Sequence, residues 1–159
     1  INYKKIKILI HPQSYLHGII KFNNGITKLL VHDTDMKIPI YNSLYTNNLK
    51  ISSNQIDLKK INNLNLEKPN IKKFKSLKLL KYIPNDISLY ETALVSANDE
   101  LVNHFLKGKI KYTEIIDYLF QIMKFKDILT LKRKKPKTVD QIMKLNEYVR
   151  LKTTYHCIK

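Results

Sequence analysis

The spacing of the apolar residues changes once along the 159-residue chain, and this change limits the folds that the chain can adopt. Between residues 16 and 22 the side chains alternate with the period of two that is typical of a β-strand. One face of this predicted strand carries Leu16, Gly18, Ile20 and Phe22. After residue 70 the apolar residues recur every three or four positions, as in amphipathic helices. The sequence therefore predicts an α+β protein.

A tight turn divides the N-terminal region into a β-hairpin. The run Asn23-Asn24-Gly25 favours this turn because Asn and Gly tolerate positive φ, and residues 26–31 return as the partner strand. A further short strand is predicted over residues 4–10. Pro39 is expected to begin a helix that runs to about Tyr45, since the N–H that proline lacks has no partner in a first turn.

Four helical stripes are expected in the C-terminal half, after a polar connecting segment over residues 46–70. The first spans Phe74–Ile83 and stops at Pro84. The second includes Leu94, Ala97, Leu101 and Phe105 and ends at Gly108. Thr113 is expected to cap the third, and after a basic linker over residues 132–137 Thr138 is expected to cap the last, with Val139, Ile142, Met143 and Val149 facing inward. Helices of this length are not stable singly, so they predict a four-helix bundle.

The net charge of +16 at first suggests a nucleic-acid-binding protein. The charge is spread over the whole chain, however, and all but two of its 29 basic residues are Lys. Nucleic-acid-binding proteins favour Arg, whose planar guanidinium group pairs with phosphate and guanine. A solvated Lys-rich surface is therefore preferred, and nucleic acid is not expected as a partner. Cys157 is the only cysteine, and no apolar run is long enough to span a membrane.

Two short segments could carry chemistry. His11-Pro12-Gln13-Ser14, followed by His17, could supply metal ligands or a nucleophile, but no acidic or Cys ligand stands nearby and no G-x-S-x-G elbow is present. The alternative is a turn between strands with hydrogen-bonded histidines. Met36, in Asp35-Met36-Lys37, could form a flexible apolar wall for a ligand or belong to the core. The residues by themselves leave these alternatives open.

The same two segments resemble a known signature. The pattern I-H-P-Q-S-x-x-H-G-I-I-x-F-x-x-G from Ile10 to Gly25, followed by D-M-K-I-P-I at 35–40, is similar in order and spacing to that of the 1-deoxy-D-xylulose 5-phosphate reductoisomerases. Weaker similarity extends through most of the chain to the last helix, 138–150. The resemblance implies an enzyme that uses NADPH and Mg²⁺ or Mn²⁺ to convert 1-deoxy-D-xylulose 5-phosphate to 2-C-methyl-D-erythritol 4-phosphate.

The resemblance also implies a domain organisation. Residues 1–48 would be the C-terminal part of the catalytic domain, 49–69 a linker and 70–159 the C-terminal helical domain. The hairpin would join a sheet that forms a homodimer contact. With the Lys-, Asn- and Ile-rich composition, the pathway suggests either a plastid or the cytoplasm of a bacterium.

The resemblance assigns roles to four residues. Ser14 and His17 would lie beside the substrate pocket, Met36 would pack near the nicotinamide, and His11 would fix the turn. Thr34 stands where the family usually has Pro, which removes a constraint on the loop before Met36.

The family's acidic metal ligands, phosphate-binding residues and glycine-rich dinucleotide turn precede the histidine-proline motif, and none of them occurs in this sequence. We therefore expect the chain to be a fragment that has no activity alone. Two alternatives remain, a basic helical module that binds nucleic acid and a degenerate relative without activity.

Overall fold

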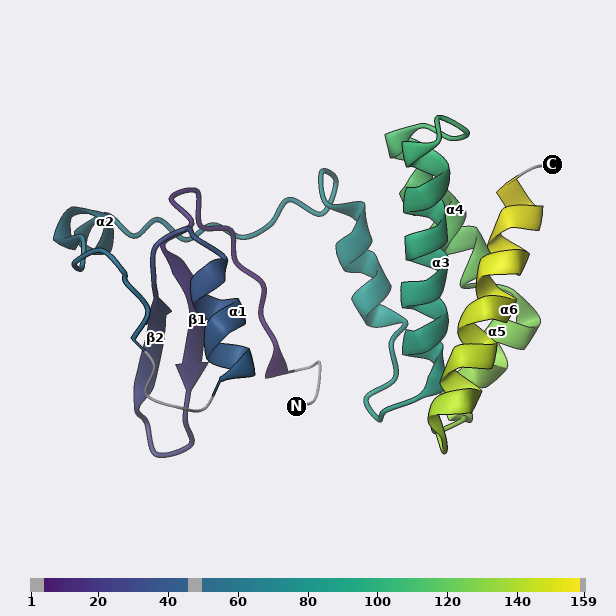
Figure 1. Cartoon of the computed structure of the whole chain (residues 1–159), viewed down its shortest axis with the longest axis horizontal. Coiled ribbons are helices and arrows are strands. Elements are labelled where there is room, and N and C mark those ends of the chain that lie inside the picture. Colours follow the sequence, from purple (N-terminus) through teal and green to yellow (C-terminus); the bar gives the residue numbers. More distant parts are fainter. Residues whose placement is uncertain (1–4, 46–49, 158–159) are drawn as a thin grey trace. The chain divides into compact units, whose positions relative to one another are not determined.

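The computed structural model describes residues 5–45 and 50–157, and its chain forms two compact units (Figure 1). One unit comprises residues 8–69 and the other comprises residues 70–159 with the N-terminal residues up to Lys7. The first unit contains the strands and the second contains the long helices, which confirms the α+β class. None of the helices in these ranges is long and apolar enough to cross a membrane.

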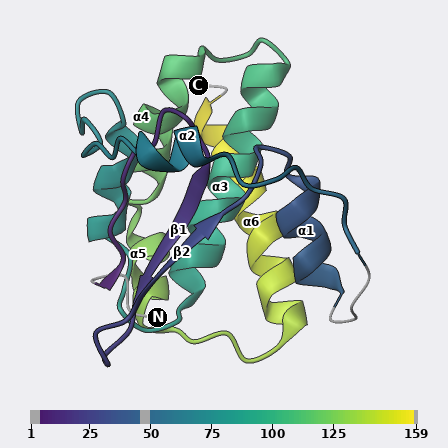
Figure 2. The same ribbon diagram turned by 90° about the vertical axis from the view of Figure 1, so that its left-hand side faces the viewer.

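The first unit is organised around the expected hairpin. Strands β1 (Leu16–Lys21) and β2 (Thr27–Val31) pair antiparallel, with Ile19 opposite Leu29 (Figures 1 and 2). The turn is closed by a 2.8 Å hydrogen bond from the Phe22 N–H to the Ile26 carbonyl. Gly25 has a φ of 88°, a conformation that favours glycine.

The strand predicted over residues 4–10 does not form. Residue 4 lies outside the described residues, and of residues 5–10 only Ile10 pairs, in an isolated bridge with Glu67. Two backbone hydrogen bonds of 2.9 Å join these residues. A β-branched run becomes a strand only where a partner runs beside it, and the described residues supply such a partner only at Glu67.

The expected helix near Pro39 is present as α1 (Lys37–Leu44), which begins two residues before that proline. Pro39 still lies in the first turn, where its missing N–H costs nothing. The connecting segment also contains a short helix that was not expected, α2 (Leu58–Asn62), whose first turn is capped by the Asp57 carboxylate.

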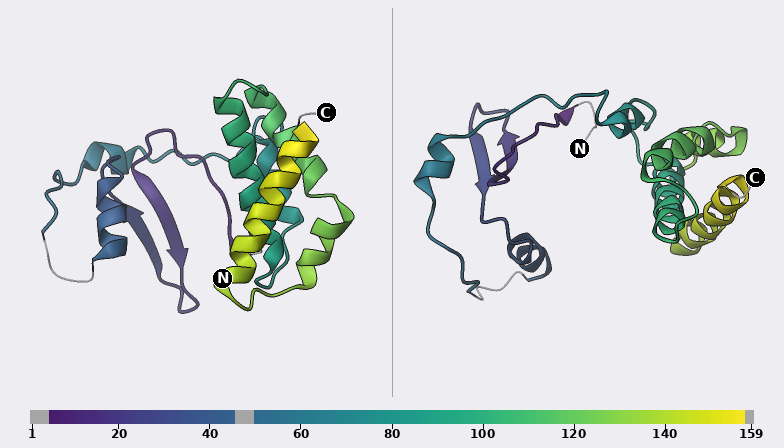
Figure 3. Two further views of the ribbon diagram at one scale, coloured as in Figure 1. Left: turned by 45° about the vertical axis from the view of Figure 1, so that its right-hand side comes forward. Right: turned by 90° about the horizontal axis from the view of Figure 1, so that it is seen from above.

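The second unit is built around the long helix α3 (Leu89–Leu106). Helix α6 (Val139–Cys157) runs along it, and α4 (Tyr112–Ile122) packs on another side (Figures 1 and 3). The remaining elements are the 3-10 helices η2 (Lys75–Lys81) and η3 (Leu131–Arg133) and the short helix α5 (Lys126–Thr130). The core is formed by fully buried residues, among them Ala93, Ala97, Leu101, Ile122 and Val149.

The ends of α3 follow local signals in the sequence. The Ser88 hydroxyl accepts a 3.2 Å hydrogen bond from the Tyr90 N–H and so caps the helix N-terminus. Gly108, at a φ of 71°, ends the helix, and the Lys109 N–H donates to the His104 carbonyl over 2.9 Å. The expected stop at Gly108 is confirmed.

Three expectations for the helical half are wrong in detail. The stripe over 74–83 forms the 3-10 helix η2 rather than an α-helix, and within η2 only Leu79 is buried, so little packing favours the α form. Thr113 does not cap α4, because the helix begins at Tyr112 and the Glu114 carboxylate accepts from the Lys111 N–H over 2.7 Å.

The third correction concerns the inward face of α6. Val149 is fully buried and Ile142 is partly buried against the core, as expected. Val139 and Met143, in contrast, are 72% and 51% exposed. Met143 stands six residues before Val149, which is roughly 120° around a helix, so the two cannot share one face.

Candidate functional site

The turn that precedes β1 holds Ser14 in an unusual backbone conformation. Its φ is 51°, and its N–H donates a 3.0 Å hydrogen bond to the His11 carbonyl. A non-glycine residue in the left-handed region costs on the order of 1 kcal/mol, and such residues are concentrated at functional sites. The Ser14 side chain is exposed, so its hydroxyl can reach a ligand.

His11 joins this turn to the segment that ends at Pro69. Its Nδ1 lies 3.1 Å from the Asn65 carbonyl, two residues before the bridge between Glu67 and Ile10. Its Nε2 is buried and has no hydrogen-bond partner within the described ranges. These contacts fit a residue that fixes the turn, the role expected for His11.

His17 lies at a β-bulge and stacks on a second histidine. Leu16 pairs with Val31 and Gly18 with Leu30, so His17 is the extra residue of β1. The centroid of its ring lies 3.6 Å from the centroid of the His32 ring, and the two ring planes are inclined by 10°. Bulges of this kind change the direction of a side chain and occur often beside active sites.

The hydrogen bond of His17 determines which of its nitrogens can meet a ligand. Nε2 lies 3.3 Å from the His32 carbonyl, so it carries the proton and donates. In the neutral ring, Nδ1 then holds the lone pair and can accept a hydrogen bond. His17 as a whole is exposed, so a ligand can approach its ring.

The loop after His32 is fixed by two aspartates. The Asp33 carboxylate accepts a 3.1 Å hydrogen bond from the Asn54 N–H, and the Asp35 carboxylate accepts one of 2.9 Å from the Lys37 N–H. Met36 directly precedes α1, and its side chain is 60% exposed. Met36 is therefore a surface residue of this chain rather than part of its core.

The structure links the two sequence segments through His32. His17 stacks on His32, which is four residues before Met36, and the turn of Ser14 leads directly into β1. Sequence reasoning did not single out His32. The only signal for it is the hairpin register, which brings the end of β2 beside the start of β1.

A metal site is not formed by these residues. Within the ranges 5–45 and 50–157 no three His, Cys, Asp or Glu side chains are arranged to hold an ion. The sequence also has no G-x-G-x-x-G motif for a dinucleotide, as its three glycines are Gly18, Gly25 and Gly108. In the first unit, Ser14, His17 and Met36 are all exposed, so the hydroxyl, the imidazole and the thioether are open to solvent.

The second unit contains a half-buried polar network between α3 and α6. Arg150 donates to the Glu100 carboxylate over 3.2 Å and to the Asp99 carboxylate over 3.1 Å. The Thr154 hydroxyl donates to Glu100 over 3.1 Å, and Nε2 of the buried His104 lies 3.1 Å from that hydroxyl. Desolvation acts to raise the pKa of Glu100, but the hydrogen bonds from Thr154, Arg150 and Asn103 and the charge of His104 together outweigh it, so the pKa is lowered.

Comparison with known proteins agrees with the motif. Residues 32–152 match the model of the DXP reductoisomerase C-terminal domain. A 1-deoxy-D-xylulose 5-phosphate reductoisomerase of Pelagibacter ubique is 51% identical over 153 residues, which are 96% of this chain and 39% of that protein. The corresponding protein of Aquifex aeolicus is 33% identical over 150 residues, 94% of this chain and 38% of that protein. The chain thus spans about two fifths of the length of these relatives.

Solved structures give the same result. A DOX-P reductoisomerase with fosmidomycin and magnesium superimposes with a TM-score of 0.79 and 26% identity, over 97% of this chain and 40% of that one. The Zymomonas mobilis reductoisomerase in complex with NADPH superimposes with a TM-score of 0.75, over 98% of this chain and 40% of that one. At 19% identity the second likeness bears on the fold alone.

Proposed function

This chain belongs to the 1-deoxy-D-xylulose 5-phosphate reductoisomerase family, and we propose that it forms the C-terminal part of an active member. That enzyme would convert 1-deoxy-D-xylulose 5-phosphate to 2-C-methyl-D-erythritol 4-phosphate with NADPH and Mg²⁺ or Mn²⁺. Support for the cofactors comes from solved relatives that contain NADPH and magnesium. The described residues build neither a metal site nor a dinucleotide site, so the part of this chain would be to bind and orient the substrate.

His17 is the residue that carries the proposal. Its place at the bulge and its stacking on His32 hold the imidazole in one orientation. With Nε2 donating to a carbonyl, Nδ1 can accept a hydrogen bond from a hydroxyl group of the sugar phosphate. A positioned acceptor of this kind orients the substrate before reaction, which lowers the entropic part of the barrier.

The other candidate residues of the two segments would complete the surface that binds the substrate. The Ser14 hydroxyl would donate to the substrate, Met36 would supply an apolar contact to the nicotinamide, and His11 would hold the turn through Asn65. The strained φ of Ser14 supports its role because strain persists where the surroundings fix a useful geometry.

The domain organisation of the enzyme would follow the two units. Residues 1–48 would complete the catalytic domain, 49–69 would connect it and 70–159 would form the helical domain. The division of the structure at Pro69 supports the second boundary, whereas the first lies outside the described residues. The exposed apolar strands would take part in a homodimer contact. The bacterial relatives favour a bacterial cytoplasm over a plastid.

A chimera tests the proposal. The part of the Pelagibacter ubique relative that matches this chain would be replaced by residues 1–159, and oxidation of NADPH would be followed with and without the sugar phosphate. At 51% identity we expect the chimera to fold and to turn over substrate. The isolated chain should show no turnover, because its described residues form no metal site and its sequence has no G-x-G-x-x-G turn for a dinucleotide.

The outcomes separate the possible failures. A chimera that melts cooperatively and binds NADPH but turns over no substrate would contradict the proposal and favour a degenerate relative. Turnover by the isolated chain would contradict the expected inactivity of the chain alone. The unmodified relative is the matched control for expression, folding and cofactor binding.

A further inference from the structure

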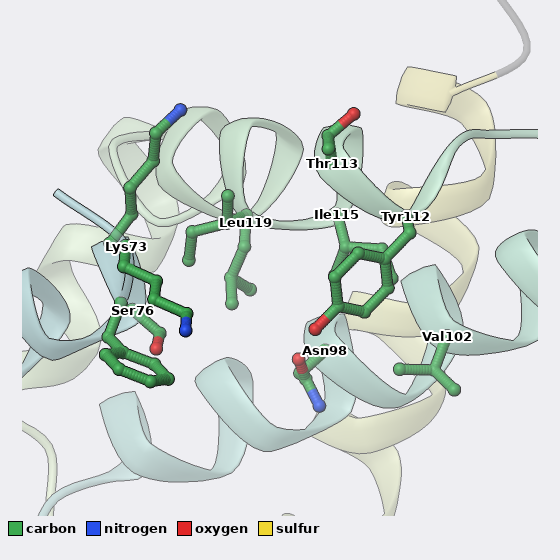
Figure 4. Close-up of a pocket in the computed structure, with 11 residues that line it drawn as sticks. Lys73, Ser76, Asn98, Val102, Tyr112, Thr113, Ile115 and Leu119 are labelled. Atoms are coloured by element: carbon green, nitrogen blue, oxygen red, sulfur yellow. The ribbon is translucent and has the colours of Figure 1, made fainter.

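A pocket of about 370 Å³ opens in the helical unit between the start of η2, α3 and α4 (Figure 4). Its volume lies in the lower part of the range of small-molecule sites. All the residues that line it lie between Lys73 and Leu119, so the pocket belongs to one compact unit. None of the residues proposed to meet substrate or cofactor contributes to it.

One side of this pocket is apolar. Ile115, Ile116 and Leu119 of α4 and Val102 of α3 line it (Figure 4). Leu119 is 3% exposed and belongs to the core, so the wall is held firmly by the packing behind it. An apolar group that enters the pocket exchanges contact with water for contact with these side chains. This exchange stabilises the bound state by roughly 25 cal/mol per Å² of apolar surface buried.

The exposed aromatic ring of Tyr112 bounds the pocket on the side of α3. The Tyr112 hydroxyl and the Asn98 amide point toward one another (Figure 4), and the ring packs edge-on against Phe105 with centroids 5.7 Å apart. Tyr112 is 73% exposed. A flat or branched apolar ligand could bury this ring without disturbing the core.

Two lysines of the η2 region give the opposite rim a positive charge. The Lys75 ammonium lies 3.8 Å from the Asp117 carboxylate, so part of its charge is compensated. Within the described residues no carboxylate lies at ion-pair distance from Lys73, whose ammonium sits 5.7 Å from the centre of the Phe74 ring. An anion placed at this rim meets one uncompensated ammonium and a second that is only weakly held.

We propose that this pocket binds an amphipathic anion, with its compact apolar body over Ile116 and Leu119 and its acidic group at Lys73 and Lys75. Ammonium groups act as point charges and demand no fixed geometry, so a carboxylate, sulfonate or phosphate would suit them. A cation would be repelled at this rim, and a neutral sugar would leave its hydroxyl groups unpaired over the apolar wall.

Two fluorescent probes test the proposal on the 159-residue chain. Anilinonaphthalene sulfonate carries the charge and the apolar rings, and phenylnaphthylamine carries the rings alone. We expect single-site binding of both probes, with the sulfonate bound several-fold more tightly. Lys73→Ala should weaken the sulfonate about threefold, in line with one exposed ionic contact, and leave the neutral probe unchanged. Asp117→Asn should strengthen the sulfonate by a similar factor, because it releases Lys75.

The apolar wall is tested by Tyr112→Ala, which removes an exposed ring and should weaken both probes. Lys144→Ala, an exposed lysine of α6 that does not line the pocket, is the matched control and should change neither. Melting curves show whether each variant stays folded, since these dyes also bind loosely packed states. Equal effects of Lys73→Ala and Lys144→Ala, no gain from Asp117→Asn, or unchanged binding in Tyr112→Ala would each overturn the proposal.

Discussion

The imidazole rings of His17 and His32 stack with their centroids 3.6 Å apart and their planes inclined by 10°. His32 contacts His17 in two ways, since the His32 backbone carbonyl also accepts the hydrogen bond from His17 Nε2. The backbone contact survives any substitution of the His32 side chain, so the stacking and the hydrogen bond can be separated by mutation.

Replacing His17 should impair catalysis in the active chimera. We expect His17→Ala to lower kcat/KM by roughly tenfold to a hundredfold, the effect of losing one hydrogen bond to a bound polar group. His17→Asn retains a donor and an acceptor and should recover part of this loss. Steady-state rates of NADPH oxidation would measure both, and an unchanged kcat/KM in His17→Ala would exclude His17 from the site.

Replacing the His32 side chain should have a smaller effect, because this ring only positions His17. His32→Phe keeps a flat ring for stacking and should retain most of the activity, whereas His32→Ala removes the support. We expect kcat/KM several-fold lower in His32→Ala than in His32→Phe. Equal values in the two variants would show that the stacking does not orient His17.

Two leucines of α3 test how much the buried core contributes to the stability of the helical unit. Leu101 of α3 is fully buried, whereas Leu106 of the same helix is 73% exposed. We expect Leu101→Ala to lower the free energy of unfolding by about 3 kcal/mol through lost burial and a cavity. Leu106→Ala should change it by less than about 0.5 kcal/mol. Urea unfolding followed by circular dichroism would measure both, and similar losses would contradict the burial pattern.

The elements that the sequence predicted correctly have local signals. The hairpin follows from Asn23-Asn24-Gly25 and the end of α3 from Gly108, where a positive φ is needed. The strand over residues 4–10 failed because strand formation depends on a distant partner, which local sequence does not reveal. The short helix α5, with only five residues, has too few positions to show a period.

The candidate site was predictable only in part. Ser14, His17 and Met36 were predicted as site residues from the resemblance to a family motif. The residues alone were also consistent with a purely structural turn and with a methionine of the core. His32 was missed because its contact with His17 spans fifteen residues and depends on a bulge. A bulge changes the register by one residue, and Gly18, directly after His17 in β1, is the local signal for it in the sequence.

The stability of the helical unit should depend on the ionisation of Glu100. The hydrogen bonds that lower its pKa favour the carboxylate in the folded state. A lowered folded-state pKa contributes stability above the unfolded carboxyl pKa of about 4.3, and this contribution is lost as the pH falls through the folded-state pKa. We therefore expect wild type to exceed Glu100→Gln in unfolding free energy at pH 7, and the difference to shrink at acidic pH.

The groups that face Glu100 set the control for this experiment. Arg150, Thr154 and His104 contact its carboxylate, and burial together with the charge of Glu100 raises the pKa of Cys157. Glu147→Gln removes an exposed carboxylate from the same helix as Arg150 and should leave the pH profile unchanged. A difference between wild type and Glu100→Gln that stays constant from pH 7 to about 3 would contradict the assignment.

Two threonines allow a test of helix capping, because the sequence predicts a cap at both and the structure has one only at Thr138. The Thr138 hydroxyl accepts a 3.2 Å hydrogen bond from the Gln141 N–H at the start of α6, so Thr138→Ala should cost about 1 kcal/mol of unfolding free energy. Thr113 has the same residue type near the start of α4, but the Glu114 carboxylate closes that turn instead. Thr113→Ala should therefore cost less than about 0.5 kcal/mol, whereas Glu114→Ala should cost about as much as Thr138→Ala. Equal losses for the two threonine variants would mean that Thr113 does cap α4.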